Sequence, residues 1–298
     1  MFAIKISGLS KTYKNGYKAL KKIDLQIKKG QFLALVGRNG AGKTTLIEIL
    51  SSLIKKSTGS VIINSNNIET NNQLIKSKIG IVPQEVNLSI FETVLQVLVT
   101  QAGYFGINKD VAIQRAEQYL KELDLWEKRN QSITTLSGGM KKRVMIARAL
   151  MHEPNIIFFD EPTAGVDAEA RQKIWKIMKD LNNQGKTIIL TTHYFNEVEK
   201  LCDSLAIISE GRIIINDSLK KIINNHKKQS YLIELEHGSH ITIKDKAILR
   251  LSNCLFEISL DIETNLSKII LKIINCGGNI LSIEPKNNRL EELFLSLS

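Results

Sequence analysis

Residues 37–44 read Gly-Arg-Asn-Gly-Ala-Gly-Lys-Thr and fit the pattern Gly-x-x-x-x-Gly-Lys-Ser/Thr at every position. The apolar run at 32–36 is typical of a buried strand, and residues 45–50 have helical spacing. Chance alone would produce the pattern in about one chain in a hundred of this length. The strand and helix on the correct sides reduce that further, so the stretch predicts a phosphate-binding loop.

The chemistry expected of this loop is the binding of ATP with Mg²⁺. Glycines let backbone N–H groups close around the β-phosphate, at a helix N-terminus whose partial positive charge favours an anion. Lys43 is expected to reach the β- and γ-phosphates, and Thr44 to hold Mg²⁺. The predicted phosphate-binding residues are Gly37, Arg38, Asn39, Gly40, Ala41, Gly42, Lys43, Thr44 and Thr45.

The composition is that of a chain of 298 residues with a net charge of +11, long enough for one large or two modest domains. The positive excess lies in residues 1–220 and is scattered in short pairs, which argues against a nucleic-acid partner and favours a surface near anionic lipid headgroups. Three widely spaced cysteines argue against a disulfide framework and a zinc site. Neither a signal peptide nor an apolar run of about 18 residues is evident, so a cytoplasmic chain is expected.

The pattern of apolar residues divides the chain into two predicted domains. Residues 1–223 alternate strands and helices around continuous apolar runs, which is typical of an α/β domain with a parallel sheet. A largely helical insertion is expected at about 85–152. Polar residues 224–230 are expected to form a linker. Residues 224–298 mix helices with strands, one of them expected at 241–243, and predict a small α+β domain.

Two adjacent carboxylates end the apolar run at 156–161. Asp160 is placed to organise Mg²⁺ opposite Thr44, and Glu161 to polarise a water for in-line attack on the γ-phosphate. The alternative is an acidic strand end that faces solvent. A phosphate loop in the same sheet favours the catalytic interpretation.

Two further features are ambiguous on local chemistry. Residues 136–140 read Leu-Ser-Gly-Gly-Met and precede a helix, so they could form a phosphate contact or a simple turn. Tyr13 could stack on a nucleotide base, because a flat ring offers a large contact area at low entropic cost, or it could pack on the surface.

Taken with Gln84, Asp167 and His193, each of which follows an expected strand or the carboxylate pair, the order and spacing resemble the ATP-binding subunit of an ABC transporter. In that family's terms residues 37–44 match Walker A, Asp160 and Glu161 match Walker B and the catalytic base, and residues 136–140 match the signature. The fold that this implies is a P-loop NTPase core of the ABC ATPase type. It includes an antiparallel β subdomain and a helical subdomain, with the small C-terminal α+β domain added.

The resemblance also implies roles for the remaining motif residues. Gln84 would contact Mg²⁺ and the attacking water, His193 would be the switch histidine, and Tyr13 would stack on adenine. Two copies would form a head-to-tail homodimer, in which one copy's signature completes the other copy's ATP site. Asp167 matches the D-loop and would contact nucleotide. The signature residues expected to contact nucleotide are Ser137, Gly138 and Gly139.

Within the family, four short stretches resemble ABC-2-type exporters: 82–85, 147–152, 192–194 and 290–294. Their residues are most similar to those of a bacterial group labelled YadG. This implies a separately encoded polytopic permease, which would hold the chain at the cytoplasmic face of the plasma membrane. Residues 91–93 are candidates for the permease contact, or for an ordinary helix start. Met140 stands where many members carry Gln, but ABC-2-type members often share the Met.

Two other functions are weighed against transport. A soluble ABC ATPase could act on ribosomes, DNA or an assembly machinery, and the basic charge permits it. The chain shows neither a second ATPase unit nor long coiled coils, which such proteins usually carry. A stand-alone nucleotide-binding regulator conflicts with Glu161 and the intact signature.

Overall fold

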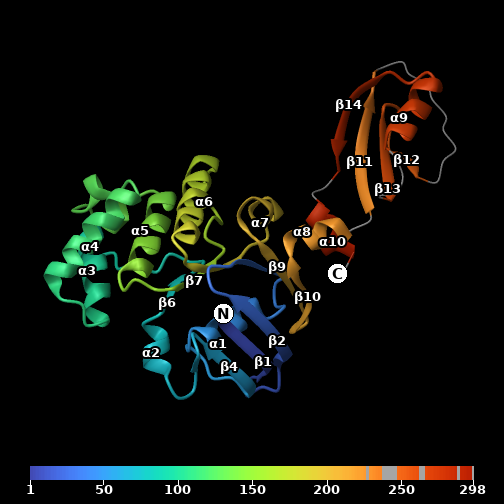
Figure 1. Cartoon of the computed structure of the whole chain (residues 1–298). Coiled ribbons are helices and arrows are strands. Elements are labelled where there is room, and N and C mark those ends of the chain that lie inside the picture. The colour runs from blue at the N-terminus through green and yellow to red at the C-terminus, as the bar shows by residue number, and fades with distance from the viewer. Residues whose placement is uncertain (226–227, 237–246, 262–265, 287–288, 297–298) are drawn as a thin grey trace. The chain divides into compact units, whose positions relative to one another are not determined.

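The computed structural model describes residues 1–225, 228–236, 247–261, 266–286 and 289–296 (Figure 1). The chain forms two compact units, Met1–Ser218 and Leu219–Ser298. Each unit has an apolar core of its own. Every residue predicted to bind or hydrolyse nucleotide lies in the first unit.

The main sheet of the first unit consists of β3 (Phe32–Val36), β6 (Ile79–Val82), β7 (Ile156–Asp160), β8 (Thr187–Thr191), β9 (Ser204–Ser209) and β10 (Arg212–Ser218). The strand order is β10-β9-β3-β8-β7-β6, and β3, β8, β7 and β6 are parallel neighbours in turn. Every residue of β3 is buried, which explains its continuous apolar run. Because the strands are parallel, the residues that follow their C-terminal ends meet at one edge of the sheet.

A second, antiparallel sheet covers the phosphate-loop helix. It consists of β1 (Phe2–Thr12), β2 (Lys18–Lys28), β4 (Thr58–Ile63) and β5 (Asn66–Asn67), in the order β2-β1-β4-β5. Helix α1 (Lys43–Leu50) lies beside this sheet (Figure 1). Leu46 and Ile49 of α1 share one core with Ile4 of β1 and Phe158 of β7. The helix is therefore fixed between the two sheets.

A helical part follows β6. It contains α3 (Val94–Tyr104), α4 (Lys109–Glu122) and α5 (Gly138–Leu150), with short 3₁₀ turns at Trp126–Lys128 and Ile133–Thr135, while α2 (Asn72–Lys76) precedes β6. Figure 1 shows α3, α4 and α5 gathered together. A capping box joins the side chains and backbone of Thr93 and Gln96 at the start of α3. These three helices lie within residues 85–152, where the sequence predicts the helical insertion.

The remaining helices of the first unit alternate with strands. Helix α6 (Ala168–Asn183) follows β7, and α7 (Phe195–Leu201) follows β8. Strands β9 and β10 form the predicted hairpin, whose turn residues Glu210 and Gly211 have φ of 47° and 76°. Positive φ at both turn positions matches the right-handed twist of the paired strands.

The second unit combines an antiparallel sheet with helices. Its described elements are α8 (Leu219–Asn225), β11 (Lys228–Leu235), β12 (Ile248–Arg250), β13 (Leu255–Asp261), α9 (Leu266–Asn275), β14 (Ile280–Pro285) and α10 (Arg289–Ser296). The strand order within the described residues is β12-β13-β11-β14. Ile269 and Ile273 of α9 pack against Ile233, Phe256 and Ile258 of the sheet. Apolar residues at i and i+4 of α9 thus face the sheet.

Some expectations for this region need correction. The linker expected at 224–230 is wrong, because α8 continues to Asn225 and β11 begins at Lys228, and the units divide after Ser218 rather than after residue 223. Leu219 and Ile222 are buried at i and i+3, a helical spacing that the polar residues after them obscured. The strand expected at 241–243 lies outside the described residues. Among the helices that the structure describes, none is long and apolar enough to span a membrane.

Candidate active site

The phosphate loop joins β3 to α1 through glycines with a backbone conformation that other residues rarely adopt. Gly40 and Gly42 have φ of 78° and 112°, and α1 begins after Gly42 without a side-chain cap. A Cβ on Gly42 would lie 2.8 Å from the carbonyl oxygen of Ala19, whereas nothing lies within 4 Å of a Cβ on Gly40. An open, uncapped helix N-terminus fits a phosphate group.

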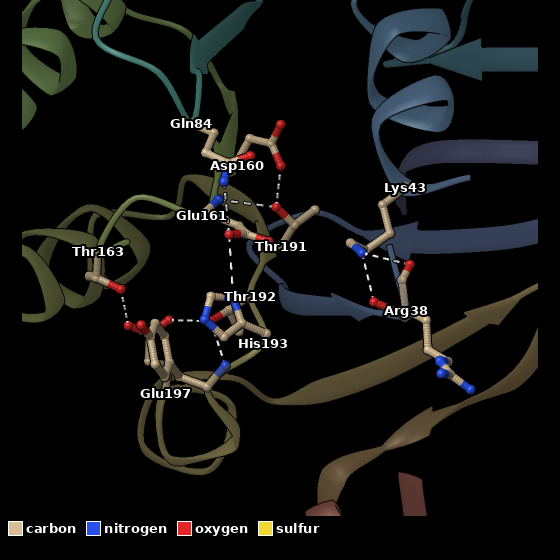
Figure 2. Close-up of polar contacts among 12 residues, drawn as sticks. Arg38, Lys43, Gln84, Asp160, Glu161, Thr163, Thr191, Thr192, His193 and Glu197 are labelled. Atoms are coloured by element: carbon tan, nitrogen blue, oxygen red, sulfur yellow. Dashed lines mark hydrogen bonds and ion pairs between the residues drawn. The ribbon is translucent and has the colours of Figure 1, made fainter. Parts of the chain in front are cut away.

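Lys43 is folded back onto this loop. Its Nζ donates to the carbonyl oxygens of Gly37 (2.6 Å) and Arg38 (3.1 Å), as Figure 2 shows. Burial lowers the pKa of the Lys43 ammonium, and the nearby carboxylates of Glu161 and Asp160 oppose that shift. The loop therefore holds a partly desolvated cation, which favours a phosphate as a partner.

Asp160 and Glu161 follow the end of β7 and are held by the neighbouring strand β8. The Thr191 hydroxyl donates to Asp160 Oδ1. The backbone N–H of Glu161 donates to both the carbonyl oxygen and Oγ1 of Thr191, each at 3.1 Å. Glu161 has a φ of 44°, a left-handed conformation that costs a non-glycine residue about 1–3 kcal/mol. The two bonds from the Glu161 N–H hold its backbone in this conformation.

Gln84 and His193 meet the Glu161 carboxylate from the two flanking strands. Gln84 Nε2 donates to Glu161 Oε2 at 3.1 Å, and His193 Nδ1 lies 3.3 Å from the same oxygen. Figure 2 shows Glu161 between these two side chains. Two of the three residues predicted to be catalytic, Gln84 and His193, thus contact one carboxylate oxygen of the third, Glu161, and the three follow the C-terminal ends of β6, β8 and β7.

A cavity of about 590 Å³ brings this cluster together with the phosphate loop. It is lined by Tyr17, Ala19, Asn39, Gly40, Gly42, Lys43, Thr44, Thr45, Gln84, Asp160, Glu161 and His193. The volume is in the range typical of small-molecule sites. The structure thus places a phosphate loop and an acidic cluster around one space.

The two tyrosines near the loop differ in position. Tyr13, the predicted base-stacking residue, is half-buried and shares a 3.2 Å hydrogen bond between its hydroxyl and Thr45 Oγ1. Tyr17 is exposed, lines the cavity and donates from its hydroxyl to the Gly40 carbonyl oxygen at 3.2 Å. The sequence offered no local signal that marks Tyr17 as a residue of the cavity. The stacking of a base on Tyr13 stays a prediction.

The signature residues and Asp167 occupy helix starts outside the lining of this cavity. Ser137 Oγ accepts from Met140 N–H at 3.3 Å and caps α5, while Asp167 Oδ1 accepts from Ala170 N–H at 2.8 Å and caps α6. The bond from Ala170 lowers the pKa of the Asp167 carboxyl. Ser137 and Asp167 are both exposed, so the two residues are accessible at the protein surface.

Lys142 contacts a residue of the site and was not predicted from the sequence. It does not itself line the cavity. It is 5% exposed, and its Nζ donates to the carbonyl oxygen of Gln84. Burial lowers the pKa of Lys142, and Asp160 and Glu161 oppose the shift. In the sequence it sits within a short run of three basic residues, which by itself indicates a solvated surface rather than a buried cation.

A separate cavity of about 680 Å³ involves residues of α4, α5 and α6. Its lining mixes acidic side chains, such as Glu122 and Asp180, with basic ones, such as Arg143 and Lys176. It lacks the glycine loop that makes the smaller cavity suited to phosphate.

Comparison with protein families and curated proteins gives a consistent result. The family model described as ABC transporter matches residues 20–164. The linearmycin resistance ATP-binding protein LnrL of Bacillus subtilis is 32% identical over 296 residues, covering 94% of this chain and 93% of the relative. The Nod factor export ATP-binding protein I of Cupriavidus pinatubonensis is 37% identical over 68% of this chain and 62% of the relative. The methionine import ATP-binding protein MetN 1 of Bacillus cereus is 36% identical over 74% of this chain and 65% of the relative.

A solved structure agrees with these sequence matches. The dimeric ATP-binding cassette MJ0796, in a post-hydrolysis state bound to ADP and Pi, superposes with a TM-score of 0.66 and 31% identity. The match covers 72% of this chain and 98% of that one. The first unit thus has the fold of that cassette.

Proposed function

The chain belongs to the family of ABC transporter ATP-binding proteins, and from this premise we propose that it powers an ABC-2-type membrane exporter through ATP-dependent head-to-tail dimerisation. As a member of that family it is an ATPase that binds ATP. The ATP-hydrolysing part of this proposal is supported by the Glu161 carboxylate, which Gln84 and His193 contact in the same cavity as the phosphate loop.

The phosphate loop holds the nucleotide. Residues 37–45 surround the phosphates with backbone N–H groups, and Lys43 exchanges its contacts to the loop carbonyls for contacts to the β- and γ-phosphates. Hydroxyl, carboxylate and amide oxygens of Thr44, Asp160 and Gln84 line the cavity and fit Mg²⁺, which prefers oxygen ligands. Mg²⁺, when bound, supplies positive charge that offsets the charge developing on the phosphates.

Glu161 is the general base. Its carboxylate takes the proton of the attacking water, and the left-handed backbone at Glu161 aims the side chain into the cavity. Gln84 and His193 orient that carboxylate from either side. The roles of Glu161, Gln84 and His193 follow from the family resemblance. The contacts of Gln84 and His193 with one oxygen of Glu161 support them.

The ATP site is completed by a second copy. Ser137, Gly138, Gly139 and Asp167 do not appear among the described residues that line the cavity, although the family resemblance assigns them to nucleotide. Two head-to-tail copies bring the exposed Ser137 and Gly138 of one copy to the cavity of the other. The dimeric state of the similar cassette MJ0796 supports this arrangement.

A separately encoded polytopic permease is the proposed partner, and it holds the chain at the cytoplasmic face of the membrane. Val86, Ile90 and Phe91, which follow Gln84, are 41%, 56% and 92% exposed, and such an apolar surface suits a permease contact. Export is supported by the ABC-2-type stretches and by the similarity to the Nod factor export protein. Co-purification of a polytopic protein in detergent would support transport, whereas ribosomes or DNA in its place would favour the soluble alternative.

The experiment that tests this function is the Glu161→Gln variant. The amide keeps the size of the side chain but cannot take a proton, so we expect steady-state ATP turnover to fall by at least about a hundredfold. ATP binding should persist, and an ATP-bound dimer should accumulate on size-exclusion chromatography.

A matched control is Glu117→Gln on α4, which makes the same change at an exposed ion pair with Lys121. It should leave both turnover and dimerisation unchanged. Normal turnover by Glu161→Gln would exclude Glu161 as the base and with it the proposed mechanism.

A further inference from the structure

Glu197 of α7 carries a carboxyl group that the roles above do not use. Its side chain is fully buried and accepts three hydrogen bonds, from Thr192 Oγ1 (2.6 Å), Trp175 Nε1 (3.0 Å) and Thr163 Oγ1. Figure 2 shows this carboxyl group between Thr163 and Thr192. One buried group therefore joins three segments of the first unit.

Two of the three donors lie next to the catalytic cluster in the chain. Thr163 is two residues beyond Glu161, and Thr192 directly precedes His193. The Thr192 hydroxyl also accepts from the backbone N–H of Tyr194 at 3.0 Å. Glu197 and Thr192 thereby fix the backbone on both sides of His193.

His193 depends on that backbone for its position. Its side chain is 55% exposed and contacts Glu161 only through Nδ1, at 3.3 Å. The adjacent Tyr194 ring lies 4.0 Å away, centroid to centroid, at an inclination of 40°. Because the His193 side chain is exposed and its ring neighbour, Tyr194, is the next residue in the chain, its position depends on the residues that hold this backbone.

The burial of Glu197 calls for a reason other than stability. A buried carboxyl group loses its hydration, and among the described residues no Lys, Arg or His forms an ion pair with Glu197. Apolar residues of similar size often fill such positions at no loss of stability. The two carboxyl oxygens of Glu197 can instead hold several hydrogen-bond donors in one geometry, here the side chains of Thr163, Trp175 and Thr192.

We propose that Glu197 is a positioning residue for ATP hydrolysis, which holds His193 against the Glu161 carboxylate by fixing the hydroxyls of Thr163 and Thr192. The proposal rests on the function proposed above for Glu161 and His193. Glu197 itself does not line the nucleotide cavity.

The Glu197→Gln variant tests this role with little change of shape. The amide turns one acceptor into a donor, and the Thr192 hydroxyl, already an acceptor for Tyr194, loses the group to which it donates. We expect kcat for ATP hydrolysis to fall about tenfold or more, while KM for ATP changes by less than about twofold. The unchanged KM follows because the phosphate loop and Lys43 make no contact with Glu197.

A double-mutant cycle separates positioning from general weakening of the fold. If Glu197 acts through His193, Glu197→Gln should change kcat by less than about twofold in a His193→Ala background. If the substitution only loosens the structure, its effect should multiply with that of His193→Ala, and this result would overturn the proposal. Should His193→Ala itself leave kcat unchanged, the function proposed for His193 fails instead.

Two threonine variants provide a second test and its matched control. Thr192→Val removes the same hydrogen bond from the other side and should reproduce the loss of kcat, even if Glu197→Gln folds poorly. Thr187→Val makes the identical change at the opposite end of β8, where Thr187 Oγ1 accepts from Gly30 N–H at 3.0 Å, and should retain kcat. Equal losses in the two valine variants would contradict a specific role for the Glu197 contacts.

Discussion

Tyr13 and Tyr17 lie beside the phosphate loop with ring centroids 6.5 Å apart and ring planes inclined by 20°. The Tyr13 hydroxyl is engaged by Thr45, and only part of the ring is exposed. Tyr17 is 54% exposed and lines the cavity. A base that stacks needs an accessible ring face, so at the scale of single residues the geometry favours Tyr17, while the family resemblance favours Tyr13.

We therefore expect Tyr17→Ala to weaken ATP binding about two- to tenfold, because an aromatic stack contributes about 0.5–1.5 kcal/mol beyond buried area. Tyr17→Phe keeps the ring and should bind ATP nearly as well as the wild type. Isothermal titration calorimetry of both variants, with Tyr13→Ala beside them, measures the difference. An unchanged Kd in Tyr17→Ala with a weakened Tyr13→Ala would assign the base to Tyr13.

At the scale of elements, α5 and α6 begin close together. A Cβ on Gly139, in the first turn of α5, would lie 2.7 Å from the Cβ of Ala170 in the first turn of α6. Gly138, one residue earlier, has open space around its Cβ position. The second signature glycine is thus required by helix packing, whatever it contacts in a partner copy.

We expect Gly139→Ala to lower the free energy of unfolding by about 1–3 kcal/mol, since an added methyl group must push two helices apart. Thermal or urea unfolding of the full chain would measure it.

Gly138→Ala is the matched control, and it should leave stability unchanged or raise it by up to about 1 kcal/mol, because Ala is the better helix former. Equal destabilisation of the two variants would show that the contact with Ala170 is not what limits Gly139.

In the whole molecule, the phosphate loop and the proposed base Glu161 line one cavity, while Ser137 and Asp167 lie outside its lining. Ser137 and Asp167 cap their own helices and face the surface. A site that needs both surfaces requires a second copy, arranged head to tail.

ATP turnover per chain should consequently fall with dilution, by about tenfold for each tenfold dilution below the dimer Kd at saturating ATP. Binding of ATP to the monomer should persist, because the loop and Lys43 belong to one chain. A turnover per chain that stays constant across dilution would show that a monomer completes its own site.

Much of the first unit was predictable because the central strands of its main sheet are buried on both faces and read as continuous apolar runs. The apolar runs of β3 and β7 and the turn at Glu210 and Gly211 are local signals, and the structure confirms them. In the second unit the signals are weaker. The polar end of α8 hid both the helix and the start of β11, so the boundary was placed five residues too late.

The phosphate loop, the adjacent carboxylates and the order of the motifs could all be identified before folding, because each is set by a few consecutive residues with fixed backbone requirements. Three contacts could be found only in the folded chain: Gln84 and His193 meet one oxygen of Glu161, the buried Lys142 donates to the carbonyl oxygen of Gln84, and Glu197 joins Thr163 to Thr192. These contacts join residues from different strands and helices. The physical reason is that parallel strands bring their C-terminal ends to one edge, and a sequence does not record which side chains the sheet order places there.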